Sequence, residues 1–388
     1  MEEIALSPLR LRTDGVLSRD PPRPLSLRPE AYEREFDYLT VFYDSFRSGD
    51  GKFIVFVGPS LLNLAQPVLP GLVRAFEVGR AADAVIRRFP LVDQLWLRTS
   101  QESAVMPQGV FQETSLRVQP NLSHLYCDKK VLLTKSRDNE LVWIKDWVYF
   151  HAAHHGTNSV LLYDNASTKC TSAEIQRAIA SIRGIETALV IDWPFKFGPQ
   201  GDTGQGDSEV WDSDFSQRAI LEHARYRFLA SAHSVICGDV DELVVTQTGV
   251  SLHELAARSG VGYLRYGGHW IENAAMVSHT ERRHADFVYR LESSRANTKW
   301  TAVPKRCPPH AQWRVHKIAG MTPDSVLSES AAIRHFKAIN TNWRVPRFPF
   351  TPSTEGAATQ RFPQRRRFHR TACGSCRTRR GLCAGALA

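Results

Sequence analysis

The strongest constraint on the fold is an alternation of short apolar runs and amphipathic stretches between Lys129 and Asp239. The stretches place apolar residues on one helical face, as Leu141, Ile144 and Trp147 do in the first of them. This order predicts an α/β fold with a mainly parallel sheet and right-handed crossovers. The apolar runs, which have the length and residue types of buried strands, are Lys130–Thr134, Ser159–Tyr163, Glu186–Ile191 and Val235–Cys237.

Asp239 and Asp241 directly follow the last of these apolar runs. Alternation along an extended strand would put both carboxylates on one face, with Val240 turned away. Neighbouring carboxylates repel each other unless a cation or a shared proton relieves them, so the pair suggests a divalent metal site with oxygen ligands. Asp-x-Asp is also common in surface turns, and that interpretation stays open.

Polar clusters follow the earlier apolar runs as well, at residues 135–140 and at Asp164–Asn165. In open α/β sheets, ligands bind beyond the carboxyl ends of the strands. We therefore expect these clusters and residues 239–242 to converge on one site. Taken alone, Asp164–Asn165 is a typical turn sequence, and Glu140 could merely complement a helix N-terminus that has Asp138 as its N-cap.

Several segments carry a family resemblance as an ordered set: Asp138–Glu140, Trp143–His151, Val160–Thr168, Gln217 and Gly238–Leu243. Together they resemble the glycosyltransferase 92 family and its bacterial glycosyltransferase-2-like relatives. The resemblance covers about residues 129–344. It implies a GT-A fold, a nucleotide-sugar donor and a divalent metal ion at the Asp-x-Asp, usually Mn²⁺, with Mg²⁺ as the alternative.

The resemblance also implies roles for individual residues. Asp241, with Asp239, matches the site of the metal and the donor diphosphate. His316 is the candidate third metal ligand and His335 its alternative, although His316 could instead be a half-buried, hydrogen-bonded histidine. The positions matched to the donor are Asn139, Glu140 and Asp164 near the nucleotide, and Lys299 as a point charge for a phosphate.

An inverting transferase, which the resemblance implies, needs a carboxylate to take the proton of the acceptor hydroxyl. Glu272 and Asp286 lie after the Asp-x-Asp, in the half expected to face the acceptor, and Glu272 ranks first. Trp270 and Trp300 could stack on sugar rings or pack in the core. Lys169 departs from the family pattern, which usually has an acidic residue after Ser-Thr, and this leaves both the donor contact and activity open.

Three regions are expected: an N-terminal accessory region (1–128), a GT-A domain (129–345) and a disordered, Arg-rich tail (346–388). In the accessory region, residues 52–57 and 94–97 read as strands, whereas residues 61–75 and 81–89 have helical patches. This region contains no catalytic motif.

Positive charge is concentrated near the C-terminal end. The formal net charge is +9, and eight arginines after Glu355, with no acidic residue among them, account for all but one of those charges. The tail could contact an anionic membrane weakly, whereas the nearly neutral body makes nucleic acid an unexpected partner. Cys373, Cys376 and Cys383 leave a zinc site open, although their spacing fits no common zinc pattern.

No stretch approaches the roughly 18 apolar residues of a membrane span. The seven cysteines, an odd number, do not suggest a disulfide framework. We therefore expect a cytoplasmic protein that could lie peripherally at the inner membrane.

The resulting hypothesis is a metal-dependent hexosyltransferase of polysaccharide biosynthesis. It would use a nucleotide diphosphate sugar, with UDP as the expected nucleotide, and a glycan or lipid-linked acceptor. The alternative is a catalytically inactive nucleotide- or carbohydrate-binding protein on the same fold.

Overall fold

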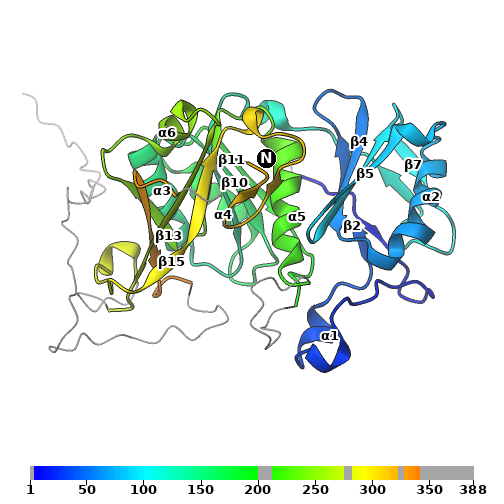
Figure 1. Ribbon diagram of the computed structural model, residues 1–388, viewed down its shortest axis with the longest axis horizontal. Helices are drawn as coiled ribbons and strands as arrows, with labels where there is room; N and C mark the ends of the chain where they lie inside the picture. The colour runs from blue at the N-terminus through cyan, green and yellow to red at the C-terminus, as the bar shows by residue number, and fades with distance from the viewer. Residues whose placement is uncertain (1–3, 200–211, 275–281, 322–326, 341–388) are drawn as a thin grey trace, which may run out of the picture.

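The computed structural model describes residues 4–199, 212–274, 282–321 and 327–340. Two β-sheets stand side by side, and helix α5 (Phe215–His223) lies between them (Figure 1). The expected tail, with Cys373, Cys376 and Cys383, lies outside the described residues. In the part of the chain that is described, no helix combines the length and the apolar character needed to cross a membrane.

The larger sheet has eight strands in the order β11-β10-β9-β12-β15-β14-β18-β13. From β11 to β12 all neighbours are parallel, as the alternation predicts. In the other half, β15 is antiparallel to β12 and β14, β18 is parallel to β14, and β13 is antiparallel to β18. The strands are β9 (Lys130–Ser136), β10 (Ser159–Asp164), β11 (Thr187–Asp192), β12 (Ser234–Cys237), β13 (Glu242–Thr246), β14 (Tyr263–Ile271), β15 (Arg295–Ala302) and β18 (Ala331–Phe336).

Both faces of the parallel half are buried, which explains its continuous apolar runs. Successive side chains of a strand point to opposite faces. Leu132 and Val160 thus pack in the core that contains α3, α4 and α6, whereas Val131 and Leu161 pack in the core that contains α5. The helices are α3 (Leu141–His155), α4 (Ser172–Ala180) and α6 (Leu252–Arg258).

Local chemistry sets the ends of these helices. Thr171 and Glu174 form a capping box at the start of α4. Gly156, with a φ of 67°, ends α3 in the left-handed conformation that glycine adopts most easily. Asp138 is not the N-cap of α3, contrary to expectation: Glu140 precedes the helix, and Asp138 Oδ1 instead accepts a hydrogen bond of 2.6 Å from the backbone N of Thr168.

The N-terminal region forms its own antiparallel sheet in the order β3-β4-β6-β5, with α2 (Ala65–Ala75) beside it (Figure 1). The helical expectation for residues 81–89 is wrong, because residues 84–89 pair with β6 as an antiparallel strand and this pairing overrides the local pattern. The remaining elements are β1 (Leu9–Arg10), α1 (Tyr32–Glu35), β2 (Thr40–Phe42), β3 (Asp44–Arg47), β4 (Phe53–Pro59), β5 (Ala84–Phe89), β6 (Val92–Arg98), β7 (Ser103–Val105), β8 (Ser115–Arg117), β16 (Gln312–Trp313) and β17 (Ile318–Ala319).

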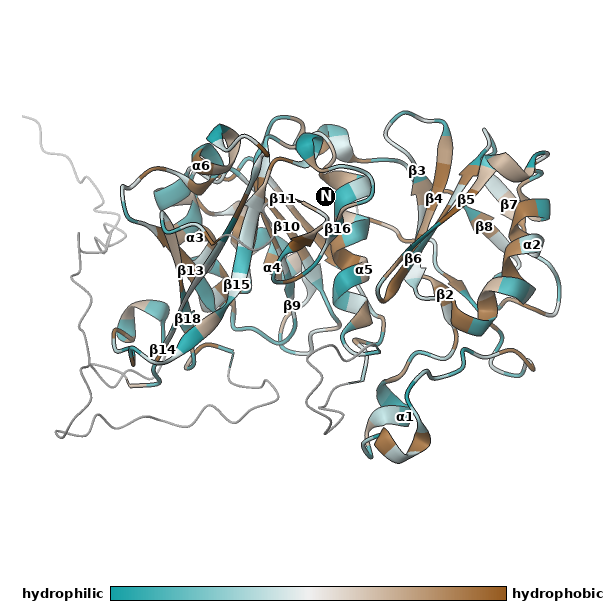
Figure 2. Ribbon diagram, in the orientation of Figure 1, coloured by the Kyte–Doolittle hydropathy of each residue, from teal (hydrophilic) through white to brown (hydrophobic). Residues whose placement is uncertain are grey.

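The N-terminal region is not packed as a separate body. One continuous apolar core contains Tyr43 and Val55 of the N-terminal sheet, Ile220 of α5 and Tyr163 of β10. Figure 2 shows the apolar residues concentrated on the strands and on the helices that cover them. The two sheets therefore share a buried apolar layer around α5, and we expect them to unfold together.

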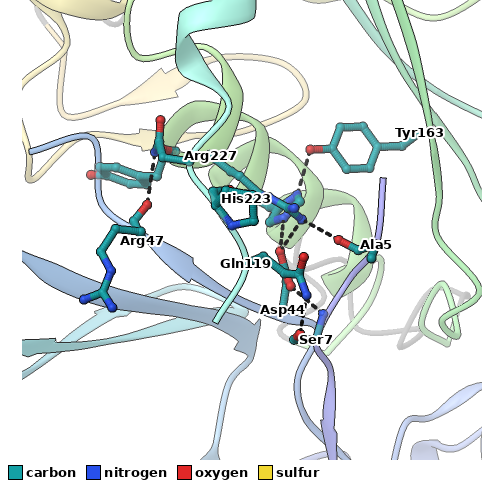
Figure 3. A network of polar contacts seen from close by, with 11 residues as sticks. Ala5, Ser7, Asp44, Arg47, Gln119, Tyr163, His223 and Arg227 are labelled. Carbon is teal, nitrogen blue, oxygen red and sulfur yellow. Dashed lines mark hydrogen bonds and ion pairs between the residues drawn. The ribbon is translucent and has the colours of Figure 1, made fainter. Parts of the chain in front are cut away.

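A buried polar network crosses the same junction (Figure 3). Asp44 of β3 accepts hydrogen bonds from Arg227 Nη1 at 2.7 Å and from the backbone N of Ser7 at 2.7 Å, and its Oδ2 lies 2.8 Å from His223 Nε2. The other ring nitrogen of His223 lies 2.7 Å from the hydroxyl of Tyr163. The side chains of Asp44 and His223 are fully buried, so the charge on Asp44 depends on these partners.

His151 on α3 gives the fold a predictable response to acid. Its ring is buried, and Nδ1 hydrogen-bonds to the carbonyl oxygen of Trp147 at 2.8 Å. Burial, and then the neighbouring His155, lower the pKa of His151 to about 3. An unfolded histidine has a pKa of about 6.5, so on acidification the unfolded chain takes up the proton before the folded chain does. His151 therefore lowers the free energy of unfolding by about 2 kcal/mol between about pH 7.5 and pH 5.

The substitution His151→Gln removes this proton uptake. Urea unfolding at both pH values measures the difference in stability between wild type and variant. We expect the variant to be less stable at the higher pH and to recover most of that deficit in acid. A deficit that does not change with pH would show that His151 does not titrate on unfolding.

Candidate functional site

The strand order of the larger sheet reverses between β9 and β12. From β9 the chain builds outward through β10 to β11, and then returns to place β12 on the other side of β9. Cys237 pairs with Leu133, and the backbone N of Gly238 donates to the carbonyl oxygen of Leu133 at 3.2 Å. Lys135 and Asp239 therefore both lie where the strand order reverses, which is the usual ligand position in open α/β sheets.

The Asp-x-Asp occupies a turn and not the end of a strand. Strand β12 ends at Cys237, and the backbone N of Glu242 donates to the carbonyl oxygen of Asp239 at 3.0 Å. The argument from strand alternation is therefore wrong for these residues. Val240 is still buried in the core, and the turn leaves Asp239 and Asp241 at the edge of the sheet.

Lys299 of β15 is the cation of this site. Its side chain is 1% exposed, and its Nζ lies 2.5 Å from Asp239 Oδ2 and 3.2 Å from Glu242 Oε2. Glu242 Oε2 also accepts a hydrogen bond of 2.9 Å from the backbone N of Asp239. Glu242 Oε2 thus contacts both the ammonium of Lys299 and the backbone of the Asp-x-Asp turn.

His335 of β18 contacts the second aspartate. Its Nε2 lies 3.2 Å from Asp241 Oδ2, and its Nδ1 lies 3.4 Å from Glu242 Oε1. The ring stacks on Trp270, with centroids 3.7 Å apart and planes inclined by 25°. Trp270 and His335 are direct partners in the parallel pairing of β14 and β18, so the sheet itself sets the position of the imidazole.

The first choice for a third metal ligand, His316, lies near the same cluster: burial lowers the pKa of its imidazole to about 4, and the charges of Lys299, Asp239 and His335 also act on it. Its Nδ1 is 3.0 Å from the carbonyl oxygen of Thr298, and its own carbonyl accepts a hydrogen bond of 2.6 Å from the Thr298 hydroxyl. The alternative ligand, His335, is the histidine that meets Asp241. Trp300 is fully buried and donates to the carbonyl oxygen of Arg314 at 2.7 Å, so it packs in the core and does not offer a face to a sugar.

Burial is the largest single influence on the pKa values of Glu242, Asp239 and Lys299. Burial raises the pKa of Glu242 to about 7, although the Lys299 ammonium acts in the opposite direction. Burial also acts to raise the pKa of Asp239, but the charge and hydrogen bond of Lys299, together with the charge of His335, leave that pKa below its ordinary value. Burial alone would lower the pKa of Lys299, yet Asp239 and Glu242 raise it. Lys299 and Asp239 are therefore both charged at neutral pH.

Lys135 adds a second cation near the carboxyl ends of β9 and β12. Burial lowers the pKa of Lys135 to about 8, and the charges of Asp239 and Asp214 oppose that effect. Its ammonium nitrogen lies 3.9 Å from the centroid of the Phe197 ring. Lys135 belongs to the polar cluster at residues 135–140, and no role was predicted for it. The signal in the sequence was a lysine directly after a predicted buried strand.

The donor types gathered here match those of Mn²⁺ sites. Asp239, Asp241 and His335 supply two carboxylates and an imidazole, and the side chain of Asp239 is 33% exposed. Glu242 Oε1 is buried and accepts no hydrogen bond within the described residues. Among those residues, no three His, Cys, Asp or Glu side chains are already arranged to hold a metal ion. The donor types would suit a divalent ion, and Lys299 holds Oδ2 of Asp239.

The residues matched to the nucleotide lie at the ends of β9 and β10. Asn139 is buried, and its side-chain amide donates to Ser136 Oγ at 2.9 Å. Lys169, the residue that departs from the family pattern, forms an ion pair with Glu140. This ion pair links the segments that follow β9 and β10. Asp164 is buried, and its carboxylate accepts hydrogen bonds from Ser167 within the following turn. This contact agrees with the turn interpretation of Asp164.

The two candidate bases differ in their surroundings. Glu272 is buried just beyond β14, and both of its carboxylate oxygens lie 2.8 Å from Lys337 Nζ. It follows Trp270 by two residues, whereas Lys337 follows His335 by two, so this ion pair continues the same strand pairing. Asp286 accepts a hydrogen bond of 2.8 Å from the backbone N of Arg283 at the start of a short helical turn. Glu272 is thus the carboxylate placed along the strand that also positions His335.

A scan against protein-family models finds no match for this chain, and a search of curated proteins finds no similar sequence.

Proposed function

We propose that this chain is a metal-dependent glycosyltransferase with a GT-A fold. It would transfer a hexose from a nucleotide diphosphate sugar, with UDP as the expected nucleotide, to a glycan or lipid-linked acceptor with inversion. The observation that carries the proposal is the point where the strand order reverses, at the carboxyl ends of β9 and β12, where Lys135 and the Asp-x-Asp turn lie near Lys299 and His335 from the other half of the sheet.

The balance of charge explains why a cation would be required. Asp239, Asp241 and Glu242 place three carboxyl groups close together, and the buried Lys299 is in direct contact with Asp239 and Glu242. A diphosphate would bring further negative charge to this edge of the sheet, which costs free energy unless a cation accompanies it. Asp239, Asp241 and His335 are the residues that would hold such an ion.

The proposed reaction divides the work among several residues. When bound, the divalent ion neutralises the charge that grows on the leaving diphosphate. Lys135 and Lys299 place fixed positive charge beside the same group. Trp270 keeps the ring of His335 in position by stacking, and Glu272 takes the proton of the acceptor hydroxyl.

A screen of nucleotide sugars tests the proposal directly. The purified chain is incubated with each nucleotide sugar and Mn²⁺, and the release of nucleotide diphosphate is compared with a reaction that contains EDTA and with one that lacks the protein. We expect release from at least one donor that requires the metal. Equal release with and without protein across the whole panel, together with no binding of UDP and Mn²⁺ by calorimetry, would refute the function.

Glu272→Gln tests the assignment of the base. Its neutral amide cannot take a proton, so we expect kcat for transfer to fall by about 10²-fold while the affinity for UDP and Mn²⁺ stays the same. Calorimetry and the transfer assay measure the two quantities separately. Asp286→Asn is the matched control and should retain wild-type kcat. If Asp286→Asn abolishes transfer and Glu272→Gln does not, the two roles are reversed.

The second candidate function is that of a nucleotide- or carbohydrate-binding protein without catalysis. Both oxygens of Glu272 are held by Lys337, which stabilises the charged carboxylate and opposes its use as a base. Tight binding of UDP with neither hydrolysis nor transfer of any sugar would favour this function.

A further inference from the structure

Two pockets meet at Arg87 and Trp96 on the N-terminal sheet. One has a volume of about 360 Å³ and the other about 240 Å³, and Arg87 and Trp96 line both of them. Small-molecule sites begin at roughly 300 Å³, so the larger pocket has the size of such a site. Arg87 belongs to β5 and Trp96 to β6, whereas the Asp-x-Asp turn follows β12 of the larger sheet. The pockets are therefore separate from the site described above.

The guanidinium of Arg87 lies over the ring of Trp96, with its central carbon 4.1 Å from the ring centroid. The direct strand partner of Arg87 is Gln94, two residues before Trp96, so both side chains share one face of the sheet. The indole nitrogen of Trp96 donates to Gln94 Oε1 at 3.0 Å, which fixes the ring. A guanidinium stacked on a ring is restrained in position, and the N–H donors at its edge stay available for other partners.

Arg87 has capacity to bind an anion. Among the described residues, no carboxylate lies within ion-pair distance of Arg87, and its hydrogen bond to the Tyr226 hydroxyl is long at 3.4 Å. The charge of Arg87 acts on Glu222, but burial is the larger effect and raises the pKa of Glu222. The oxygens of Glu222 are held by Gln94 and by the backbone N of Trp313, both at 2.7 Å. The natural partner of Arg87 is therefore an oxyanion from outside the chain, which a guanidinium can bind through two parallel hydrogen bonds.

The other arginine of the smaller pocket, Arg225, has its donors in use. It donates to three backbone carbonyl oxygens, those of Cys307, Pro308 and Ala311. It also lies 3.9 Å from Glu222. Arg87 is thus the arginine of the two that has donors to offer a ligand.

The larger pocket adds an acceptor and an apolar wall. Asp50 accepts hydrogen bonds from the Ser48 hydroxyl at 2.6 Å and from a backbone N at 3.2 Å. Both bonds go to Oδ1, which leaves Oδ2 of this exposed residue as an acceptor for hydroxyl groups. The Phe53 ring lies edge-on to Trp96, with centroids 5.8 Å apart. An acceptor for hydroxyls, aromatic rings for an apolar C–H face and a guanidinium for an anion together match an acidic sugar.

We propose that Arg87 and Trp96, with Asp50 and Phe53, form a binding site for a sugar that carries an oxyanion, either the carboxylate of a uronic acid or a phosphate ester. Arg87 binds the oxyanion, and Asp50 accepts hydrogen bonds from the sugar hydroxyls. The inference does not rest on the function proposed above, because all four residues lie in the N-terminal region. It gives this region, which contains no catalytic motif, the task of holding an acidic saccharide.

The test is a ligand-observed NMR titration of the full chain with four probes: glucuronate, glucose 6-phosphate, glucose and inorganic phosphate. We expect at least one of the two anionic sugars to bind about tenfold more tightly than glucose, because hydrogen bonds between charged groups are the stronger ones. The same sugar should also bind more tightly than inorganic phosphate. Binding of glucuronate alone identifies a carboxylate as the recognised group, and binding of glucose 6-phosphate alone identifies a phosphate.

Arg87→Gln removes the guanidinium and should weaken binding of the anionic sugar by about tenfold. Arg88→Gln is the matched control, because it removes the same charge from the next position of β5, whose side chain points to the opposite face. The control should bind as wild type does. Circular dichroism establishes that each variant is folded. Arg87→Lys, which keeps the charge and loses the planar fork, replaces Arg87→Gln if the latter does not fold, and should also bind more weakly than wild type.

Several outcomes would overturn the inference. These are equal affinities for glucose and both anionic sugars, no binding of any sugar, and unchanged binding in Arg87→Gln. Inorganic phosphate that binds as tightly as glucose 6-phosphate would show an anion contact without recognition of a sugar. Asp241→Ala distinguishes the two sites: if it abolishes binding of the anionic sugar and Arg87→Gln does not, the sugar binds at the Asp-x-Asp turn and the inference fails.

Discussion

Asp241→Ala is expected to lower kcat for sugar transfer by about 10³-fold, at the upper end of the loss seen when one stabilising group is removed from an active site. The side chain of Asp241 is 4% exposed and meets His335, so its loss removes one carboxylate from the proposed metal site and leaves the imidazole without that partner. The backbone of the same residue accepts a hydrogen bond of 2.8 Å from Phe336. Alanine retains this bond, so the turn should keep its shape.

Transfer rates and calorimetry with Mn²⁺ and UDP measure the effect. Asp83→Asn is the control, because Asp83 pairs with Arg80 and Arg98 in the N-terminal region and not with the Asp-x-Asp turn. We expect the control to have nearly wild-type kcat. Unchanged Mn²⁺ and UDP binding in Asp241→Ala would contradict the assignment of this residue.

Asp44→Ala is expected to destabilise the folded chain by about 3–5 kcal/mol, the usual cost of leaving a buried charge without its partner. The guanidinium of Arg227 is 1% exposed and would lose the carboxylate that lies 2.7 Å from it. His223 and the backbone N of Ser7 would lose the same acceptor. Because Asp44 lies in the N-terminal sheet and His223 in α5, the damage falls on the junction of the two sheets.

Urea or guanidinium unfolding followed by tryptophan fluorescence measures this loss. Asp14→Ala is the control, because Asp14 pairs with Arg12 at the surface, where both side chains are largely exposed. Surface ion pairs contribute little, so the control should unfold at nearly the wild-type denaturant concentration. An Asp44→Ala variant that unfolds with its N-terminal sheet first and the rest at the wild-type midpoint would contradict a shared core.

The sequence by itself determined the parallel half of the larger sheet. Its apolar runs, helical faces and polar strand ends are local patterns, and each is visible within about ten residues. The same reasoning placed Asp239 and Asp241 beyond the carboxyl end of a buried strand, because they follow its last apolar residues.

Only the tertiary structure decided the partners of these residues. Lys299 is 60 residues from Asp239, and His335 is 94 residues from Asp241. Local periodicity carries no information about which of His316 and His335 meets the turn, since this depends on the pairing of β18 with β13 and β14. The bond between Asp44 and His223 spans 179 residues and is equally invisible in the sequence. Strand register and the packing of α5 between two sheets bring these charges together, and they do so through contacts that exist only once the chain has folded.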